Sequence, residues 1–260
     1  MDYDTLLIRE EGGVGVITLN RPDVMNALNK QMRAELTHAL KDLGARVRVR
    51  VLVLTGAGRA FCSGQDLGDG GNAAQIDLER TLREEYEPML HAIYDAPVPV
   101  IAAVNGSAAG AGANLALAAD VVIAAQSASF IQAFTRIGLI PDAGGTWFLP
   151  RQIGFARAMG AMLFADRISA RQAADWGMIW EAVEDDAFAD AWQSRASALA
   201  CGPTVAYRNI RLALRKSLSN PLDAQLALEA QLQAEAGKTR DFREGVMAFL
   251  EKRPASFEGR

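Results

Sequence analysis

One carboxylate near the middle of the chain stands in a setting that could make it a catalytic base. Asp142 is the only acidic residue between Val121 and Ala165, and it lies between Pro141 and a pair of glycines. Burial in apolar surroundings disfavours the charged form of a carboxylate and raises its pKa toward the range useful to a general base. An aspartate before Ala-Gly-Gly-Thr is also typical of a helix N-cap. Both interpretations of Asp142 stay open at this point.

Two loops rich in small residues each follow an apolar run. The first covers residues 55–67 and the second residues 105–112. Small residues let a backbone approach a ligand closely, and amides that are fixed before the reaction can stabilise a developing oxyanion. A helix expected from Ala113 to Ala119 would place the positive end of its dipole at the second loop. The two loops together predict an oxyanion receptor, although tight packing of a helix on a sheet also selects small residues.

The second loop does not fit the motifs that bind nucleotide phosphates. Gly110 and Gly112 are followed by Ala-Asn-Leu, so the third glycine of a dinucleotide fingerprint is missing. A phosphate-binding loop would end in Gly-Lys-Ser/Thr, and no lysine occurs between Lys41 and Lys216. Nucleotide phosphates are therefore not the expected ligand.

The cysteines and histidines support neither a metal site nor a nucleophile. Cys62 and Cys201 lack metal-ligand spacing, and His38 and His91 stand alone. We expect each histidine to be exposed on a helix and Cys62 to be a packed, buried thiol. No metal and no separate cofactor is predicted.

Composition predicts a globular protein. The 260 residues are 50% hydrophobic and 22% charged, with a net charge of −4, which disfavours disorder and a nucleic-acid partner. The apolar stretches are too short for a bilayer span, and the start at Met1 lacks the pattern of a signal peptide. We therefore expect a cytoplasmic protein with no membrane partner.

The elements that must position these residues alternate strands and helices. Residues 5–10 and 14–20 predict a hairpin, and Asn29 is a plausible cap for a helix. Buried strands are expected at residues 49–55, 98–104 and 120–125, with a long helix over 78–93 between the first two. These elements carry the two loops and Asp142.

The later part of the chain is mostly helical. Residues 68–74 form either a lid or a plain surface loop. Ser169 with Gln172 predicts a capping box, and a further helix ends at Gly202. We expect a core domain over residues 1–202 and a helical region over 203–260, which packs on the core or on another subunit.

Four motifs together make the chain resemble the enoyl-CoA hydratase/isomerase, or crotonase, family. The resemblance covers essentially the whole chain and rests on Leu19-Asn-Arg-Pro-Asp23 with Asn26-Ala-Leu28, Ala60-Phe-Cys-Ser-Gly-Gln-Asp-Leu67, Asn105-Gly-Ser-Ala-Ala-Gly-Ala-Gly112, and Ile137-Gly-Leu-Ile-Pro-Asp-Ala-Gly-Gly-Thr146. It implies an α/β spiral of strand-strand-helix repeats with a C-terminal helical trimerisation region. It also implies an acyl-CoA thioester substrate, in which CoA is part of the substrate, and a homotrimer or a dimer of trimers.

The resemblance implies the residues of the site. The oxyanion hole would consist of the backbone amides of Gln65 and Ala111. The substrate-binding residues implied are Met25, Ala27, Ala60, Gly64, Asp66, Leu67, Gly68, Gly110, Asn114, Phe134 and Ile140.

Two departures from the family pattern bear on the reaction. Hydratases of the family carry catalytic glutamates at positions that correspond to Asn114 and Phe134, and neither of these can do acid/base work on water. Asp142 remains as the single base. Within the family the chain resembles members that isomerise a ring-epoxidised phenylacetyl-CoA to oxepin-CoA in phenylacetate catabolism. This resemblance rests on Gly64-Gln-Asp-Leu67, Leu139-Ile-Pro-Asp-Ala-Gly-Gly-Thr-Trp-Phe-Leu-Pro-Arg151, Trp176-Gly-Met-Ile-Trp180 and Asp241-Phe-Arg-Glu-Gly-Val-Met-Ala-Phe-Leu250.

The resemblance favours an acyl-CoA isomerase, which would rearrange the epoxide or shift a double bond. An enoyl-CoA hydratase is the alternative, weakened by the missing glutamates. A non-catalytic scaffold or RNA-binding member is a third possibility, which the acidic net charge disfavours. Trp147, Phe134 and Phe148 could line an aromatic acyl pocket or fill the core.

Overall fold

The structure is a computed structural model, and residues 3–68 and 77–260 of it are described. Of the segment 68–74, only Gly68 falls within this description, so the expectation of a lid or a surface loop lies outside the described residues.

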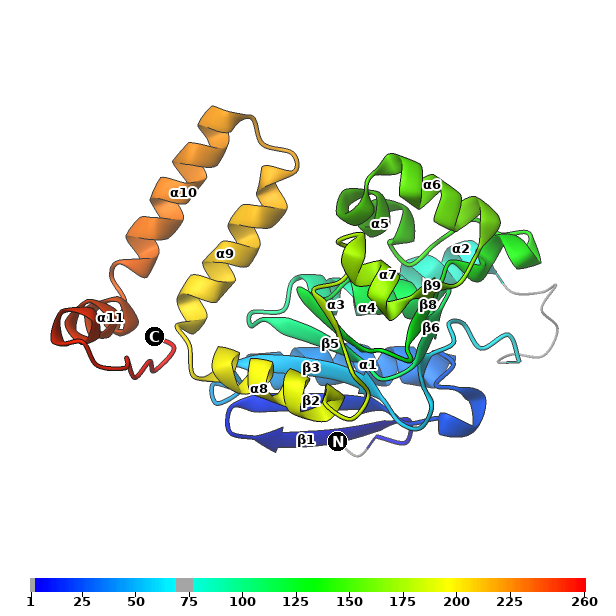
Figure 1. Ribbon diagram of the computed structural model, residues 1–260, viewed down its shortest axis with the longest axis horizontal. Coiled ribbons are helices and arrows are strands. Elements are labelled where there is room, and N and C mark those ends of the chain that lie inside the picture. Colours follow the sequence, from blue (N-terminus) through cyan, green and yellow to red (C-terminus); the bar gives the residue numbers. More distant parts are fainter. Residues whose placement is uncertain (1–2, 69–76) are drawn as a thin grey trace.

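The larger of two sheets forms the base of the molecule in Figure 1. Its six strands lie in the order β1-β2-β3-β5-β7-β10, and only the β1–β2 pair is antiparallel. The strands are β1 (Leu6–Glu11), β2 (Val14–Leu19), β3 (Val51–Gly56), β5 (Val100–Val104), β7 (Val121–Ala125) and β10 (Glu181–Val183). The hairpin and the buried strands predicted from the sequence are confirmed, with bounds that differ by one or two residues.

The second sheet is built from short strands that follow strands of the first. It has the order β4-β6-β8-β9 and consists of β4 (Ala60–Cys62), β6 (Ser107–Ala109), β8 (Ser129–Ile131) and β9 (Ile168–Ser169). Strand β4 comes directly after β3, β6 after β5, and β8 after β7, and helices follow each pair. The chain therefore repeats a strand-strand-helix unit, as the sequence predicted.

Helices cover both faces of the main sheet. On one face, Val51 and Val53 of β3 pack with Trp192 of α8 (Phe188–Ala200). On the other face, Leu52 and Leu54 join the larger core cluster with residues of α1 (Lys30–Ala45), α3 (Glu87–Tyr94) and α4 (Ala111–Leu117). A parallel sheet that is buried on both faces reads as continuous apolar runs, which is why its strands were visible in the sequence.

The helix predicted over residues 78–93 contains an irregular turn. It consists of α2 (Leu78–Thr81), a π-helical turn η3 (Leu82–Tyr86) and α3. Pro88 lies in the first turn of α3, where its missing N–H cannot continue the α-helical hydrogen bonds. The π-helical turn η3, which has wider hydrogen-bonded rings than an α-helix, accommodates this interruption.

The remaining helical elements include the turn η1 (Pro22–Val24) and the short helix α7 (Ala170–Asp175). Asn29 caps α1 by accepting from the amide of Met32, and Ser169 caps α7 by accepting from that of Gln172, both as predicted. The elements between β8 and β9 are η4 (Ala133–Ile137), α5 (Gly145–Ile153) and α6 (Phe155–Phe164).

The last three helices project away from the two sheets in Figure 1. They are α9 (Thr204–Ser217), α10 (Leu222–Ala236) and α11 (Arg240–Glu251). Arg211 of α9 ties them to the core through an ion pair with Asp120, at 2.7 Å. Large apolar side chains on these helices remain exposed, among them Leu222, Phe249 and Leu250 at 71%, 82% and 71%. No helix within residues 3–68 and 77–260 is long and apolar enough to cross a membrane.

Candidate active site

A fully buried asparagine fixes the loop that carries Gln65. The side-chain amide of Asn26 donates to the carbonyls of Ala57 and Ala60, and its oxygen accepts from the amide of Arg21 at 2.9 Å. Two residues after Asn26, the backbone amide of Leu28 donates to the carbonyl of Gly64 at 2.8 Å. The turn after β2 and the loop after β4 are thereby held against each other.

The two small-residue loops meet at their glycines. Gly64 has φ of +94°, and a Cβ atom placed on it would lie 2.8 Å from the carbonyl oxygen of Ala109 and 3.3 Å from the amide nitrogen of Ala111. Only glycine tolerates both this backbone conformation and this approach. Gly110, which precedes Ala111, has φ of +54° and ψ of −127°, and it leads directly into α4.

The amides of Gln65 and Ala111 are free to bind a ligand. Within the described part of the chain, neither amide donates a hydrogen bond. Gln65 is adjacent to Gly64, which contacts the second loop, so both amides lie at the junction of the two loops. Two preorganised donors at one place can stabilise a thioester oxygen that becomes negatively charged.

Asp142 precedes α5 but does not cap it. Ala143 and Gly144 both have positive φ, 48° and 78°, and Gly144 is the residue at the N-cap position. The backbone carbonyl of Asp142, rather than its carboxylate, accepts the amide of Gly145 at 2.8 Å. The N-cap interpretation of the Asp142 side chain is therefore wrong. Because Ala143 and Gly144 adopt left-handed conformations, the helix begins only after them, and the Asp142 carboxylate does not cap it.

The carboxyl group of Asp142 has the properties expected of a general base. Its Oδ1 atom is buried and finds no hydrogen-bond partner among residues 3–68 and 77–260. Burial raises the pKa of Asp142 from 3.8 to about 6, partly offset by a hydrogen bond from its own backbone amide. Such a group is ionised at neutral pH yet basic enough to take a proton from carbon next to a thioester.

A buried amide network holds the backbone of Asp142. Asn114, on α4, is fully buried and donates from Nδ2 to the carbonyl of Asp142 at 2.8 Å. Its Oδ1 accepts from Nε2 of Gln132, also buried, at 2.8 Å. The sequence singled out Asn114 as substrate-binding, whereas the structure gives it this positioning contact. Gln132 was missed, because a glutamine after a short strand carries no signal of its own.

The other predicted substrate-binding residues are not all brought together. Phe134 is 7% exposed and lies near Gly110, since a Cβ atom on that glycine would be 3.8 Å from the phenylalanine ring. Ala27 and Ala60 are buried, and Asp66 pairs with Arg21 at 2.8 Å. Four others lie toward the surface: Met25, Leu67, Gly68 and Ile140, of which Ile140 is 79% exposed.

Cys62 and the two histidines take no part in this chemistry. Cys62 is fully buried, and burial raises the pKa of its thiol to about 12, so it is not a thiolate at neutral pH. His38 and His91 are exposed on α1 and α3, as predicted. No group of three or more His, Cys, Asp or Glu that could hold a metal occurs in the described ranges.

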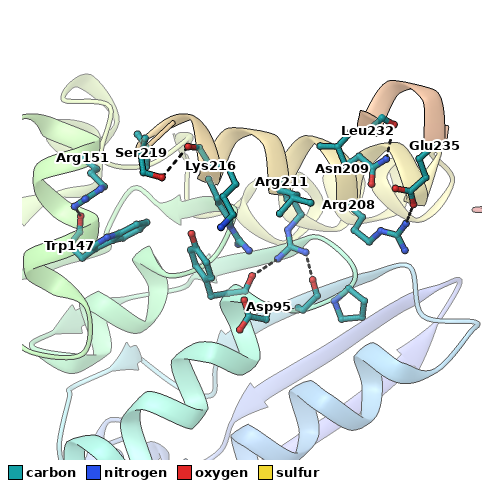
Figure 2. A pocket seen from close by; sticks show the side chains of 16 residues that line it. Asp95, Trp147, Arg151, Arg208, Asn209, Arg211, Lys216, Ser219, Leu232 and Glu235 are labelled. Carbon is teal, nitrogen blue, oxygen red and sulfur yellow. Dashed lines mark hydrogen bonds and ion pairs between the residues drawn. The ribbon is translucent and has the colours of Figure 1, made fainter. Parts of the chain in front are cut away.

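A cavity of about 850 Å³ lies elsewhere, between α9 and the core, and is lined by Trp147, Arg151 and Arg211 among others. Figure 2 shows its lining side chains. None of Asp142, Gln65 and Ala111 lines it. The candidate site is identified instead by the unbonded amides of Gln65 and Ala111 and by the buried Asp142 carboxyl, whose backbone is bonded to Asn114 on the helix that Ala111 begins.

The comparisons with known proteins agree with the fold. The family model described as "Enoyl-CoA hydratase/isomerase" matches residues 9–260. A protein of Rhodobacter capsulatus named "Probable enoyl-CoA hydratase" is 65% identical over 260 residues, the whole of both chains. The "1,2-epoxyphenylacetyl-CoA isomerase" of Escherichia coli K12 is 48% identical over 258 residues, 98% of each chain.

A solved structure shows the same architecture. The enoyl-CoA hydratase of Bacillus anthracis superposes with a TM-score of 0.92 at 33% identity, over 99% of this chain and 100% of that one. Fold, sequence and family model thus agree over nearly the full length. The chain belongs to the enoyl-CoA hydratase/isomerase, or crotonase, family of enzymes that act on acyl-CoA thioesters.

Proposed function

We propose that this enzyme is an acyl-CoA isomerase that uses Asp142 as its only base. The observation that carries the proposal is the unpartnered, buried carboxyl oxygen of Asp142, with the pKa raised by burial to about 6. The two positions at which hydratases carry glutamates correspond to Asn114 and Phe134. Asn114 is already bonded to the backbone of Asp142, and Phe134 has no group that could activate water.

The reaction needs one base and one oxyanion hole. The Asp142 carboxylate takes a proton from the carbon next to the thioester carbonyl, and the amides of Gln65 and Ala111 bind the oxygen of the resulting enolate. The protonated Asp142 then returns the proton to a different carbon of the conjugated system. A double bond has moved and no water has been consumed, so a second acid/base group is unnecessary.

The proposed substrate is a ring-epoxidised phenylacetyl-CoA, which the enzyme converts to oxepin-CoA. The name of the Escherichia coli relative supports this choice. Trp147 and Phe148, near the start of α5, contact each other at 4.9 Å between ring centroids. Together with Gly144 they line a cavity of about 400 Å³ between α3 and α5.

Hydration of an enoyl-CoA is the second candidate. It is favoured by the 65% identity to the Rhodobacter capsulatus protein, whose name is that of a hydratase. Purified protein incubated with a panel of CoA thioesters in ²H₂O, followed by mass spectrometry, separates the two. Isomerisation keeps the mass of the thioester apart from exchanged hydrogen, whereas hydration adds a whole water. Crotonyl-CoA hydration as the fastest reaction would overturn the isomerase proposal.

We also propose that the protein assembles as a trimer or a dimer of trimers through its region 203–260. The exposed apolar side chains of α9 to α11 support this, because monomers seldom leave such surfaces uncovered. The division into residues 1–202 and 203–260 is part of the same proposal.

A further inference from the structure

A buried arginine lies behind the loop that carries Gln65. Arg33, in the first turn of α1, is 4% exposed. Its Nε and Nη2 atoms donate to the carboxylate of Glu85, at 2.9 and 2.7 Å, and its Nη1 atom donates to the backbone carbonyl of Leu28. One guanidinium group therefore joins the π-helical turn η3, which contains Glu85, to the residue that pairs with Gln65.

Stability alone does not explain this ion pair. Charges that leave water lose their hydration, and replacing a buried ion pair by apolar residues of similar volume is often neutral or stabilising. Arg33 is the one charged residue among the buried residues of α1, which otherwise present side chains such as Met32 and Leu36 to the core. An apolar side chain at this position could not donate to the carbonyl of Leu28, whereas the planar fork of arginine binds that carbonyl and Glu85 at once.

Leu28 directs the amide of Gln65. The amide of Leu28 donates to the carbonyl of Gly64 at 2.8 Å, and its carbonyl accepts from the amide of Asp66 at 3.2 Å. The carbonyl of Gly64 and the N–H of Gln65 belong to one planar trans peptide group, so they point in opposite directions. Because the Gly64 carbonyl faces Leu28, the N–H of Gln65 faces away from it. A displacement of Leu28 would therefore turn the Gln65 amide.

The carbonyl of Leu28 depends on Arg33 for an anchor outside the loop. Leu28 precedes the N-cap Asn29, so its carbonyl takes no part in the hydrogen bonds within α1. The other donor to this carbonyl, the amide of Asp66, belongs to the same loop as Gln65 and moves with it. Arg33 instead ties the carbonyl to α1 and η3. An oxyanion hole is effective because its donors are fixed before the reaction, and this anchor supplies such a restraint.

We propose that Arg33 is a positioning residue of the oxyanion hole, which holds the carbonyl of Leu28 and thereby directs the amide of Gln65 at the thioester oxygen. Glu85 keeps the guanidinium group in place. In this role neither side chain exchanges a proton with the substrate. The inference rests on the proposed oxyanion hole of Gln65 and Ala111.

The direct test measures how strongly the thioester carbonyl is polarised when it is bound. Phenylacetyl-CoA labelled with ¹³C at the thioester carbonyl is added to the full-length protein, and the carbonyl stretching band is recorded by isotope-edited infrared spectroscopy. Hydrogen bonds from the oxyanion hole should move this band to a lower wavenumber in the parent than in buffer. Arg33→Met combined with Glu85→Leu removes the ion pair without leaving a buried charge, and it should return the band toward its position in buffer.

Arg211 provides the matched control. It is also buried, pairs with Asp120 at 2.7 Å and donates to the backbone carbonyl of Ala96, but these partners belong to neither small-residue loop. Arg211→Met should lower the temperature of unfolding and leave the band at the parent position. A band that stays at the parent position in the Arg33 variant as well would overturn the inference. A band that moves equally in both variants would also overturn it, because general loss of stability would then be the cause.

A second variant and a kinetic readout separate positioning from folding. Arg33→Lys keeps a positive charge beside Glu85, so it tests the inference even if the double variant does not fold. Because an ammonium group lacks the planar fork of arginine, this variant should shift the band in the same direction and lower kcat for double-bond isomerisation of a 3-enoyl-CoA by about tenfold, with KM changed by less than about threefold. A loss confined to KM would contradict the inference.

The two proposals fail in different ways. If the parent polarises the carbonyl but isomerises no thioester, the proposed isomerase function fails, and the infrared band still decides the role of Arg33. If the band of the parent coincides with that in buffer, the oxyanion hole of Gln65 and Ala111 is wrong, and the role of Arg33 is overturned with it.

Discussion

Replacing Asp142 by asparagine should abolish catalysis and at the same time stabilise the fold. Burial raises the pKa of this carboxyl from 3.8 to about 6. A difference of about two pKa units corresponds to about 3 kcal/mol for the charged form. Because the group is only partly buried, solvent screens some of this, and we expect about 1–3 kcal/mol in the free energy of unfolding. The contact from Asn114 reaches the backbone carbonyl, so the substitution leaves it in place.

The sign of the effect fixes its pH dependence. The native state binds the Asp142 proton more tightly than the unfolded chain does, so the ionised carboxylate opposes folding. Below a pH of about 4 both states are protonated and the cost vanishes; it grows between about 4 and 6 and is constant above. Urea unfolding of the parent and of Asp142→Asn across this range should therefore give curves that coincide at acid pH and separate toward neutrality.

Catalytic activity should be lost in Asp142→Asn, although the substitution stabilises the fold. Asp142→Asn should lose double-bond isomerisation by about a hundredfold or more, while kcat/KM of the parent rises with pH through about 6 and then levels off. The variant should elute from a sizing column as the parent does. A variant that isomerises at the parent rate, or that is less stable than the parent at pH about 8, would refute this account of Asp142.

Three further experiments test the oxyanion hole, the buried amide network and the assembly. Gln65→Ala should keep most activity, whereas Gln65→Pro, which removes the amide donor, should lower kcat by about a hundredfold or more, and equal kcat values would disprove the assignment. Asn114→Ala removes the contact to the Asp142 carbonyl and strands Gln132, so thermal unfolding should show a loss of about 1–3 kcal/mol together with a lower kcat. The full chain should show three or six times its 27.9 kDa in light scattering, and a chain cut after Gly202 should aggregate; a monomeric mass for the full chain would contradict the proposed assembly.

Much of the fold could be predicted because its signals are local. The hairpin, the cap at Asn29 and the buried strands depend on residue patterns over a few positions, and all three are confirmed. The π turn over Leu82–Tyr86 was not predicted, although Pro88 marks its place. Apolar residues keep an almost helical spacing through such a turn, so their pattern in the sequence does not reveal it.

The site was predicted only in part, because its geometry depends on segments far apart in the chain. The two loops could be recognised by their small residues, but the role of Asp142 turned on where α5 begins. The helix starts where it does because Ala143 has a positive φ, and an alanine in the sequence gives no sign of this conformation. Gln132 comes from another element, and its importance follows from a hydrogen bond to Asn114 that only coordinates reveal.

The repeated strand-strand-helix unit has a consequence for how such an enzyme can evolve. Gln65 follows the short strand of one unit, Ala111 that of the next, and Asp142 comes after that of the third. In the proposed mechanism each unit therefore contributes one functional group, and two of the three contributions are backbone amides that most side-chain mutations leave intact. The anion-binding half of the machinery can be inherited unchanged while the third unit acquires or loses a base. New reactions on the same class of thioester can arise by altering a single unit, without any redesign of the others.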